Sequence, residues 1–160
     1  IDGVVIGALL PDHRINDSFI KSVRKDFPNL DITFHKAFDD TPDWKYSIDV
    51  LVGAGVNRIL SSGCESHVIK GMSTLKSMIE YAQNRIEILP GGGFNENNLD
   101  FFIKNIQPEW VHFSGCKKIL DRTSSNFESE RLQFDRDRAI KMIEMSKAYS
   151  FSIDAISSDT

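Results

Sequence analysis

The chain has 160 residues, of which 41% are hydrophobic, a content typical of a globular protein with a buried core. Its formal net charge of -4 argues against a broad basic surface for nucleic acid or anionic lipid. It has no apolar run long enough to span a bilayer, and its first residues lack the basic start of a signal peptide, so we expect an intracellular protein with reduced cysteines.

Short apolar runs, mostly bounded by Gly, Pro or Asn, predict β-strands. They cover residues 4–10, 31–38, 58–62, 85–89 and 110–114, and residues 132–134 form a short final candidate. Roughly 20 residues separate successive runs, which is too long for hairpins and suits helical crossovers between parallel strands. The sequence therefore predicts a repeated strand–helix unit.

Helix signals lie between these strands. Asn16 or Asp17 begins a helix that Pro28 ends, and Thr41 is the predicted N-cap of a second helix with Pro42 at its first position. Other apolar stripes predict helices around residues 75–82, from Asn95 or Asn98 to residue 106, and over residues 136–149. The polar segment 117–130 predicts a mobile loop or a short turn of helix.

This order predicts an α/β fold, a TIM-type (β/α)8 barrel present as about six C-terminal βα units in a single domain over residues 1–160. Six units do not close an eight-stranded barrel, so we expect that the first two units are absent. An open doubly wound sheet is the alternative. In a barrel, the active site lies at the C-terminal ends of the strands.

Two predicted strands turn a histidine toward the barrel interior. Strand alternation places His35 near the mouth and directs His112 and Ser114 inward. His35 could move a proton or ligate a metal, with Asp39 orienting it and His112 assisting. The alternative is a pair of hydrogen-bonded core histidines.

Glycine and serine follow several strand ends. Gly91, Gly92 and Gly93 allow backbone amides to approach an anion closely before the next helix. Ser62 with Gly63, and Ser114, supply similar small turns at the same face. A tight turn without a ligand is the alternative.

Two thiols also follow strand ends. Cys64 and Cys116 each come after a Ser-Gly pair, and Cu(I) prefers soft thiolate ligands. His67, three residues after Cys64, is a further candidate ligand. The alternative is a pair of ordinary loop thiols, because no CxxC spacing is present.

The segments DGVVIGAL, TFHKAFD, RILSSGC, ILPGGG and VHFSG together resemble the copper homeostasis protein CutC family across roughly residues 2–116. The resemblance implies a TIM-type barrel, a cytoplasmic location with the nucleus as a second compartment, homo-oligomers and Cu(I) binding. It marks as the family's rim His35, Lys36, Asp39, Ser62, Gly63, Cys64, Gly91, Gly92, Gly93, His112 and Ser114. Position 36 is Lys where the family usually has Arg.

Three functions follow from these patterns. The first is a Cu(I)-binding homeostasis protein that uses Cys64, Cys116 and His67. The second is an enzyme for a small phosphate- or carboxylate-bearing substrate, with catalytic His35, Asp39 and His112 and an anion site formed by Lys36, Ser62, Gly63, Gly91, Gly92, Gly93 and Ser114. The third is a non-catalytic barrel that serves oligomerisation. In each case we expect no nucleic acid or membrane partner.

Overall fold

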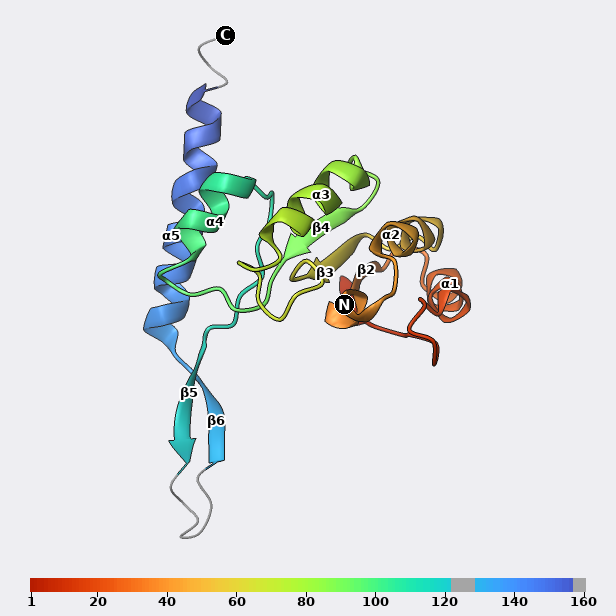
Figure 1. Ribbon diagram of the computed structural model, residues 1–160, viewed down its shortest axis with the longest axis horizontal. Coiled ribbons are helices and arrows are strands. Elements are labelled where there is room, and N and C mark those ends of the chain that lie inside the picture. The colour runs from red at the N-terminus through yellow and green to blue at the C-terminus, as the bar shows by residue number, and fades with distance from the viewer. Residues whose placement is uncertain (122–128, 157–160) are drawn as a thin grey trace. The chain divides into compact units, whose positions relative to one another are not determined.

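The computed structural model describes residues 1–121 and 129–156 (Figure 1). These residues form two compact units, each described here by itself. The first unit comprises Ile1–Gly93 with Ile106–His112, and the second comprises Phe94–Asn105 with Phe113–Thr160.

The first unit is built on a parallel four-stranded sheet in the order β1-β2-β3-β4. The strands are β1 (Gly3–Ile6), β2 (Asp31–Phe34), β3 (Arg58–Ser61) and β4 (Glu87–Pro90). Each strand pairs with the next in the sequence, as the register of Val4 with Ile32 illustrates. The predicted strand–helix repeat is therefore confirmed for these four strands, in the parallel arrangement of a partial TIM-type barrel.

Helices connect the strands of this sheet. They are α1 (Asp17–Asp26), the 3-10 helix η1 (Lys36–Asp40), α2 (Trp44–Gly53) and α3 (Met72–Ala82). The predicted N-cap Thr41 is wrong for α2, because the Asp43 carboxylate accepts from the Lys45 and Tyr46 amides and caps the helix. Thr41 instead donates its hydroxyl to the Phe38 carbonyl at the end of η1, 2.8 Å away.

The core of the first unit lies between this sheet and its helices. Apart from Ser61 and Ser62, its fully buried side chains are apolar, as expected for strands covered by crossover helices. They include Ile20, Ile32, Phe34, Phe38, Ile48, Leu51, Ile59, Leu75 and Met78. Phe38 belongs to η1, so this short helix is anchored in the core.

The Arg24 guanidinium joins the ends of several elements. It donates to the carbonyls of Gly55 at 2.7 Å, Leu30 at 2.7 Å and Pro28 at 2.9 Å, and to Asn57 Oδ1 at 2.9 Å. One side chain thus connects the C-terminal end of α1 with the segments that precede β2 and β3.

Two strands are shorter than predicted. The strand expected over residues 4–10 ends at Ile6, and the strand expected over residues 31–38 ends at Phe34. In the second case His35 turns the backbone, because its Nδ1 accepts from the Ala37 amide at 3.0 Å and caps η1.

The strand expected over residues 110–114 is reduced to a single bridge between Gly91 and His112. The His112 amide donates to the Pro90 carbonyl at 2.8 Å. Pairing goes no further because Gly92 and Gly93 have φ values of 105° and 94°, which turn the chain away from the strand direction.

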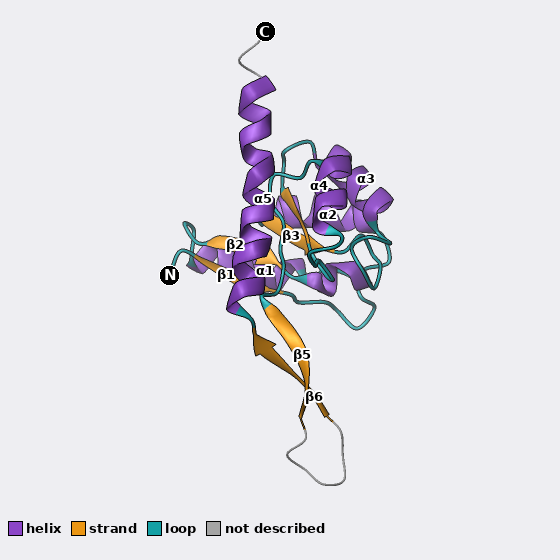
Figure 2. Cartoon of the chain, turned by 90° about the vertical axis from the view of Figure 1, so that its left-hand side faces the viewer, coloured by secondary structure: helices purple, strands orange, loops and turns teal. Residues whose placement is uncertain are grey.

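The second unit contains α4 (Leu99–Ile106, whose last residue belongs to the first unit), β5 (Cys116–Asp121), β6 (Ser129–Phe134) and α5 (Arg136–Ile156). β5 and β6 pair as an antiparallel hairpin (Figure 2). The loop predicted over 117–130 is therefore wrong at 117–121 and 129–130, and its residues 122–128 lie outside the described residues. Within the described part of the chain, no helix is both long and apolar enough to cross a membrane.

Candidate functional site

The predicted rim residues of the first unit follow the C-terminal ends of its strands. η1 follows β2, the turn Ser62-Gly63-Cys64 follows β3, and Gly91–Gly93 follows β4. Because parallel strands end at the same edge of a sheet, these segments come together.

His35 lies half-buried directly after β2. Its amide donates to the Ile6 carbonyl at 2.8 Å, and its Nδ1 accepts from the Ala37 amide. Its imidazole occupies the space beside Gly7, since a Cβ atom at Gly7 would lie 1.9 Å from His35 Cε1. A neutral imidazole that accepts at Nδ1 carries its proton on Nε2, so Nε2 is the atom that would exchange a proton with a ligand.

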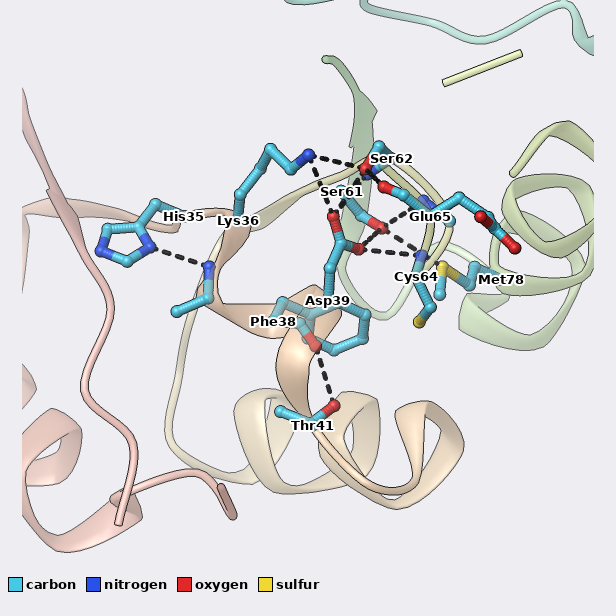
Figure 3. A network of polar contacts seen from close by, with 12 residues as sticks. His35, Lys36, Phe38, Asp39, Thr41, Ser61, Ser62, Cys64, Glu65 and Met78 are labelled. Carbon is cyan, nitrogen blue, oxygen red and sulfur yellow. Dashed lines mark hydrogen bonds and ion pairs between the residues drawn. The ribbon is translucent and has the colours of Figure 1, made fainter. Parts of the chain in front are cut away.

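Asp39 is the centre of a polar network (Figure 3). Its Oδ1 accepts from Ser61 Oγ at 2.5 Å and from the Cys64 amide at 3.1 Å. Its Oδ2 accepts from the Ser62 amide and from Ser62 Oγ, both at 2.9 Å, and lies 3.6 Å from Lys36 Nζ. The side chain is only 8% exposed, so this carboxylate organises the turn after β3 from within the protein.

These contacts bear on two expectations, one for Asp39 and one for the turn at Ser62 and Gly63. It was expected to orient His35, whereas its oxygens bind the Ser61–Cys64 turn and His35 is held by the Ala37 amide. Ser62 and Gly63 were expected to offer their turn to an external anion. Instead, the Asp39 carboxylate accepts a hydrogen bond from the Ser62 amide, and the Gly63 amide donates to Ser61 Oγ at 2.9 Å.

The Ser62 hydroxyl connects the network to Lys36. Lys36 Nζ donates to Ser62 Oγ at 2.7 Å. The hydroxyl has one hydrogen, which it shares between Asp39 Oδ2 and the Glu65 carbonyl. The Lys36 ammonium is therefore already engaged by a hydroxyl and a carboxylate.

Cys64 lies on a tight loop that two glycines close. Gly63 and Cys64 have φ values of 77° and 59°. A Cβ atom at Gly63 would lie 2.3 Å from the Gly71 carbonyl oxygen, so both ends of the loop need glycine for their close approach. Desolvation, together with the negative charges of Asp39 and Glu65, raises the pKa of the Cys64 thiol to about 11. The thiol is protonated at neutral pH.

Side chains of this chain occupy the space beside two of the glycines after β4. A Cβ atom at Gly92 would lie 3.1 Å from Lys36 Nζ, and one at Gly93 would lie 2.3 Å from the His67 ring. His67 Nδ1 accepts from the Ile69 amide at 3.3 Å. The close backbone approach that the glycines allow is thus made by Lys36 and His67.

A hollow of about 590 Å³ opens beside η1 and the Cys64 loop. It lies within the first unit and is lined by His35, Lys36, Ala37, Asp39, Asp40, Cys64, Glu65 and Ser66. Asp39, Asp40 and Glu65 contribute carboxylates, whereas Lys36 contributes an ammonium. Sequence reasoning did not single out Asp40, Glu65 or Ser66, whose only signal is that they adjoin the TFHKAFD and SSGC motifs.

The remaining predicted residues stand apart from this network. His112 is exposed, and its Cβ faces Gly91. Ser114 and Cys116 belong to the second unit, so their expected place on the same rim as Cys64 stays a prediction. Among the described residues, no group of three or more His, Cys, Asp or Glu side chains is arranged to hold a metal ion.

Comparison with known proteins finds one family. The CutC family model matches residues 1–117. The human copper homeostasis protein cutC homolog is 39% identical over 113 residues, which are 71% of this chain and 41% of the relative. A CutC family protein of Treponema denticola is 36% identical over 117 residues, covering 73% of this chain and 48% of the relative. The chain thus spans about half the length of these relatives.

A solved structure agrees with this assignment. The Streptococcus agalactiae protein described as CutC superposes with a TM-score of 0.65 at 35% sequence identity, over 69% of this chain and 55% of that protein. The family match covers every predicted rim residue from His35 to Ser114, and the parallel strands place the rim residues of the first unit at one sheet edge. On this evidence the chain belongs to the CutC family of copper homeostasis proteins.

Proposed function

We propose that this chain acts in copper homeostasis by binding Cu(I), with the Cys64 sulfur as a ligand. Membership of the CutC family carries the proposal. Cys64 supports it because it is an exposed free cysteine on the rim, and Cu(I) prefers soft sulfur ligands. His67 and Cys116 are the candidates for a second ligand.

The raised pKa of Cys64 shapes this binding. Binding to a thiol with a pKa of about 11 releases its proton, so at neutral pH each Cu(I) bound through Cys64 liberates one proton. Affinity should rise about tenfold per pH unit as long as the free thiol is protonated. Deprotonating this thiol costs free energy. A hard divalent ion binds a single thiolate too weakly to offset that cost, whereas a soft monovalent ion binds it strongly.

The test is an anaerobic Cu(I) titration of the reduced protein with a competing chelator. Cys64→Ser should abolish the tightest binding, and the matched variants Cys116→Ser and His67→Ala identify the second ligand. Unchanged affinity in Cys64→Ser would reject Cys64 as a copper ligand.

A second candidate function is an enzyme for a small phosphate- or carboxylate-bearing substrate. The observation that favours it is the hollow at the strand ends, whose volume suits a small molecule and whose wall includes His35 as a potential acid or base. His35→Ala should weaken the binding of inorganic phosphate, followed by NMR, without unfolding the protein. Unchanged binding would count against this function.

Cellular location and self-association are further parts of the proposal. The family resemblance supports a cytoplasmic protein, with the nucleus as a second compartment, that forms homo-oligomers. Fractionation of cells that express the protein would test the location, and sedimentation would test the assembly.

A further inference from the structure

A second soft sulfur atom lies beside the Asp39 network. Met78 on α3 is completely buried, and its Sδ lies 3.7 Å from Ser61 Oγ. The hydroxyl of Ser61 has one hydrogen, which it donates to Asp39 Oδ1 at 2.5 Å. The carboxylate is the stronger acceptor of the two, so the lone pairs of the Met78 thioether stay available to another partner.

Met78 and Cys64 adjoin the same small group of atoms. Asp39 Oδ1 accepts from Ser61 Oγ and from the Cys64 amide, and the amide of Gly63 donates to Ser61 Oγ. Ser61 thus contacts Met78 and also the turn that carries Cys64. Figure 3 shows Cys64 and Met78 at the same end of the polar network.

The Cys64 sulfur is partly withdrawn from water. Desolvation is the largest of the causes that raise the pKa of its thiol, ahead of the charges of Asp39 and Glu65. Cys64 also lines the hollow, whereas Met78 is buried behind its wall. An ion that enters from the hollow therefore meets the Cys64 sulfur first, and the Met78 thioether would reach it from the protein interior.

We propose that the sulfur atoms of Cys64 and Met78 together bind Cu(I), with Met78 as the second ligand of the site. The inference rests on the proposed function of Cys64. Cu(I) selects soft thiolate and thioether ligands, and Met78 supplies the thioether. Methionine is unbranched and has three rotatable side-chain bonds, so Sδ can turn toward an ion at Cys64 while α3 keeps its place.

The two other candidates for the second ligand are less suited. His67 Nδ1 accepts from the Ile69 amide, so a neutral ring carries its proton on Nε2 and has no free lone pair for a metal. Cys116 belongs to the second unit, whereas Met78 belongs to the same unit as Cys64. Met78 is thus the soft ligand that the polar network brings toward Cys64.

The first test is the anaerobic Cu(I) titration with a competing chelator, applied to Met78→Leu. Loss of an outer-shell partner alone weakens metal binding about 10–100-fold, so loss of a ligand should raise the dissociation constant at least about tenfold. Leucine has a similar volume, so the core should keep its packing. Met142→Leu is the matched control, because Met142 is also completely buried but belongs to the second unit. Its dissociation constant should stay unchanged.

Cys64→Ser in the same titration separates two kinds of failure. If Cys64→Ser weakens Cu(I) binding and Met78→Leu does not, Met78 is not a ligand and the proposed function stands. If neither variant weakens binding, the proposed function fails together with this inference. Equal weakening in Met78→Leu and Met142→Leu would also overturn the assignment of Met78.

A second measurement observes the thioether without replacing it. The chain has four methionines, and 13C labelling of their methyl groups gives each an NMR signal, of which Met78→Leu removes the one from Met78. One equivalent of Cu(I) should shift the Met78 signal, because that methyl carbon is bonded to the ligating sulfur, and leave the signals of Met72, Met142 and Met145 in place. In Cys64→Ser the Met78 signal should not move. An unmoved Met78 signal in the natural chain, or similar shifts of all four signals, would refute the two-sulfur site.

Discussion

Replacing Asp39 with alanine should destabilise the protein by about 3 kcal/mol. The Asp39 carboxylate accepts from the amides of Ser62 and Cys64 and from both serine hydroxyls of the turn after β3. In Asp39→Ala these donors lose their acceptor together. The effect on stability depends on which of them water can reach.

Ser61 and Ser62 are completely buried, so the Ser61 hydroxyl and the Ser62 amide would remain unsatisfied. Each such group costs about 1–3 kcal/mol. Met78 Sδ, 3.7 Å from Ser61 Oγ, is a weak alternative acceptor and recovers little. Water can replace the bond to the Cys64 amide because Cys64 is exposed, and relief from burying the Asp39 charge offsets part of the loss. The net loss of folding free energy in Asp39→Ala is therefore about 3 kcal/mol.

The assay is urea unfolding with linear extrapolation, and Asp40→Ala is the control. Asp40 is the neighbouring exposed carboxylate on the same hollow, and its loss should cost less than about 0.5 kcal/mol. Asp39→Asn should lie between the two, because an amide keeps one acceptor oxygen. If Asp39→Ala and Asp40→Ala unfold at the same urea concentration with the same slope, Asp39 does not hold the turn.

Three other changes test separate parts of the structure. Gly7→Ala would set a methyl group against the His35 ring and should cost about 1–3 kcal/mol in thermal unfolding, so an unchanged melting temperature would contradict this packing. In a Cys116→Ser background, Cys64 should hold about 100-fold less thiolate at pH 8 than a thiol of pKa 9, and its reaction with iodoacetamide should become faster until about pH 11; a plateau near pH 9 would refute the raised pKa. Arg24→Lys loses the planar fan of donors and should destabilise the protein by about 2 kcal/mol, and a loss below about 0.5 kcal/mol would show that water replaces these bonds.

The sequence predicts the strand–helix repeat and the edge of the sheet that carries the rim, because both depend on local signals. Apolar runs of strand length alternate with helical stripes, and a motif that directly follows a parallel strand must lie at its C-terminal end. For the same reason Lys36, Cys64 and Gly92 could be assigned to one edge before any contact was known.

The contacts within the rim depend on partners far apart in the chain. Asp39 accepts a hydrogen bond from Ser61, which lies 22 residues further along the chain, and no local sequence pattern predicts that contact. The end of β2 was also hidden, because Phe38 suits a strand as well as a buried 3-10 helix. In the hairpin, lysines and glutamates interrupt the apolar alternation, so the antiparallel pairing of Lys118 with Leu132 has no clear signal of period two.

The carboxylates of Asp39, Asp40 and Glu65 at the strand ends favour a cation over an anion in the hollow of the rim. An anion that approached Lys36 would have to separate its ammonium from Ser62 and Asp39, and would enter a hollow that Asp40 and Glu65 also line. A cation would be attracted by these carboxylates and repelled by the Lys36 ammonium on the same wall, and its binding to the Cys64 sulfur would release the thiol proton. Besides desolvation, the charges of Asp39 and Glu65 raise the pKa of the Cys64 thiol, and the same charges would attract a cation that displaces its proton. On this reasoning the acidic wall of the hollow should increase the rate of Cu(I) capture, and Glu65→Gln should slow capture at low salt while leaving the thiol ligand in place.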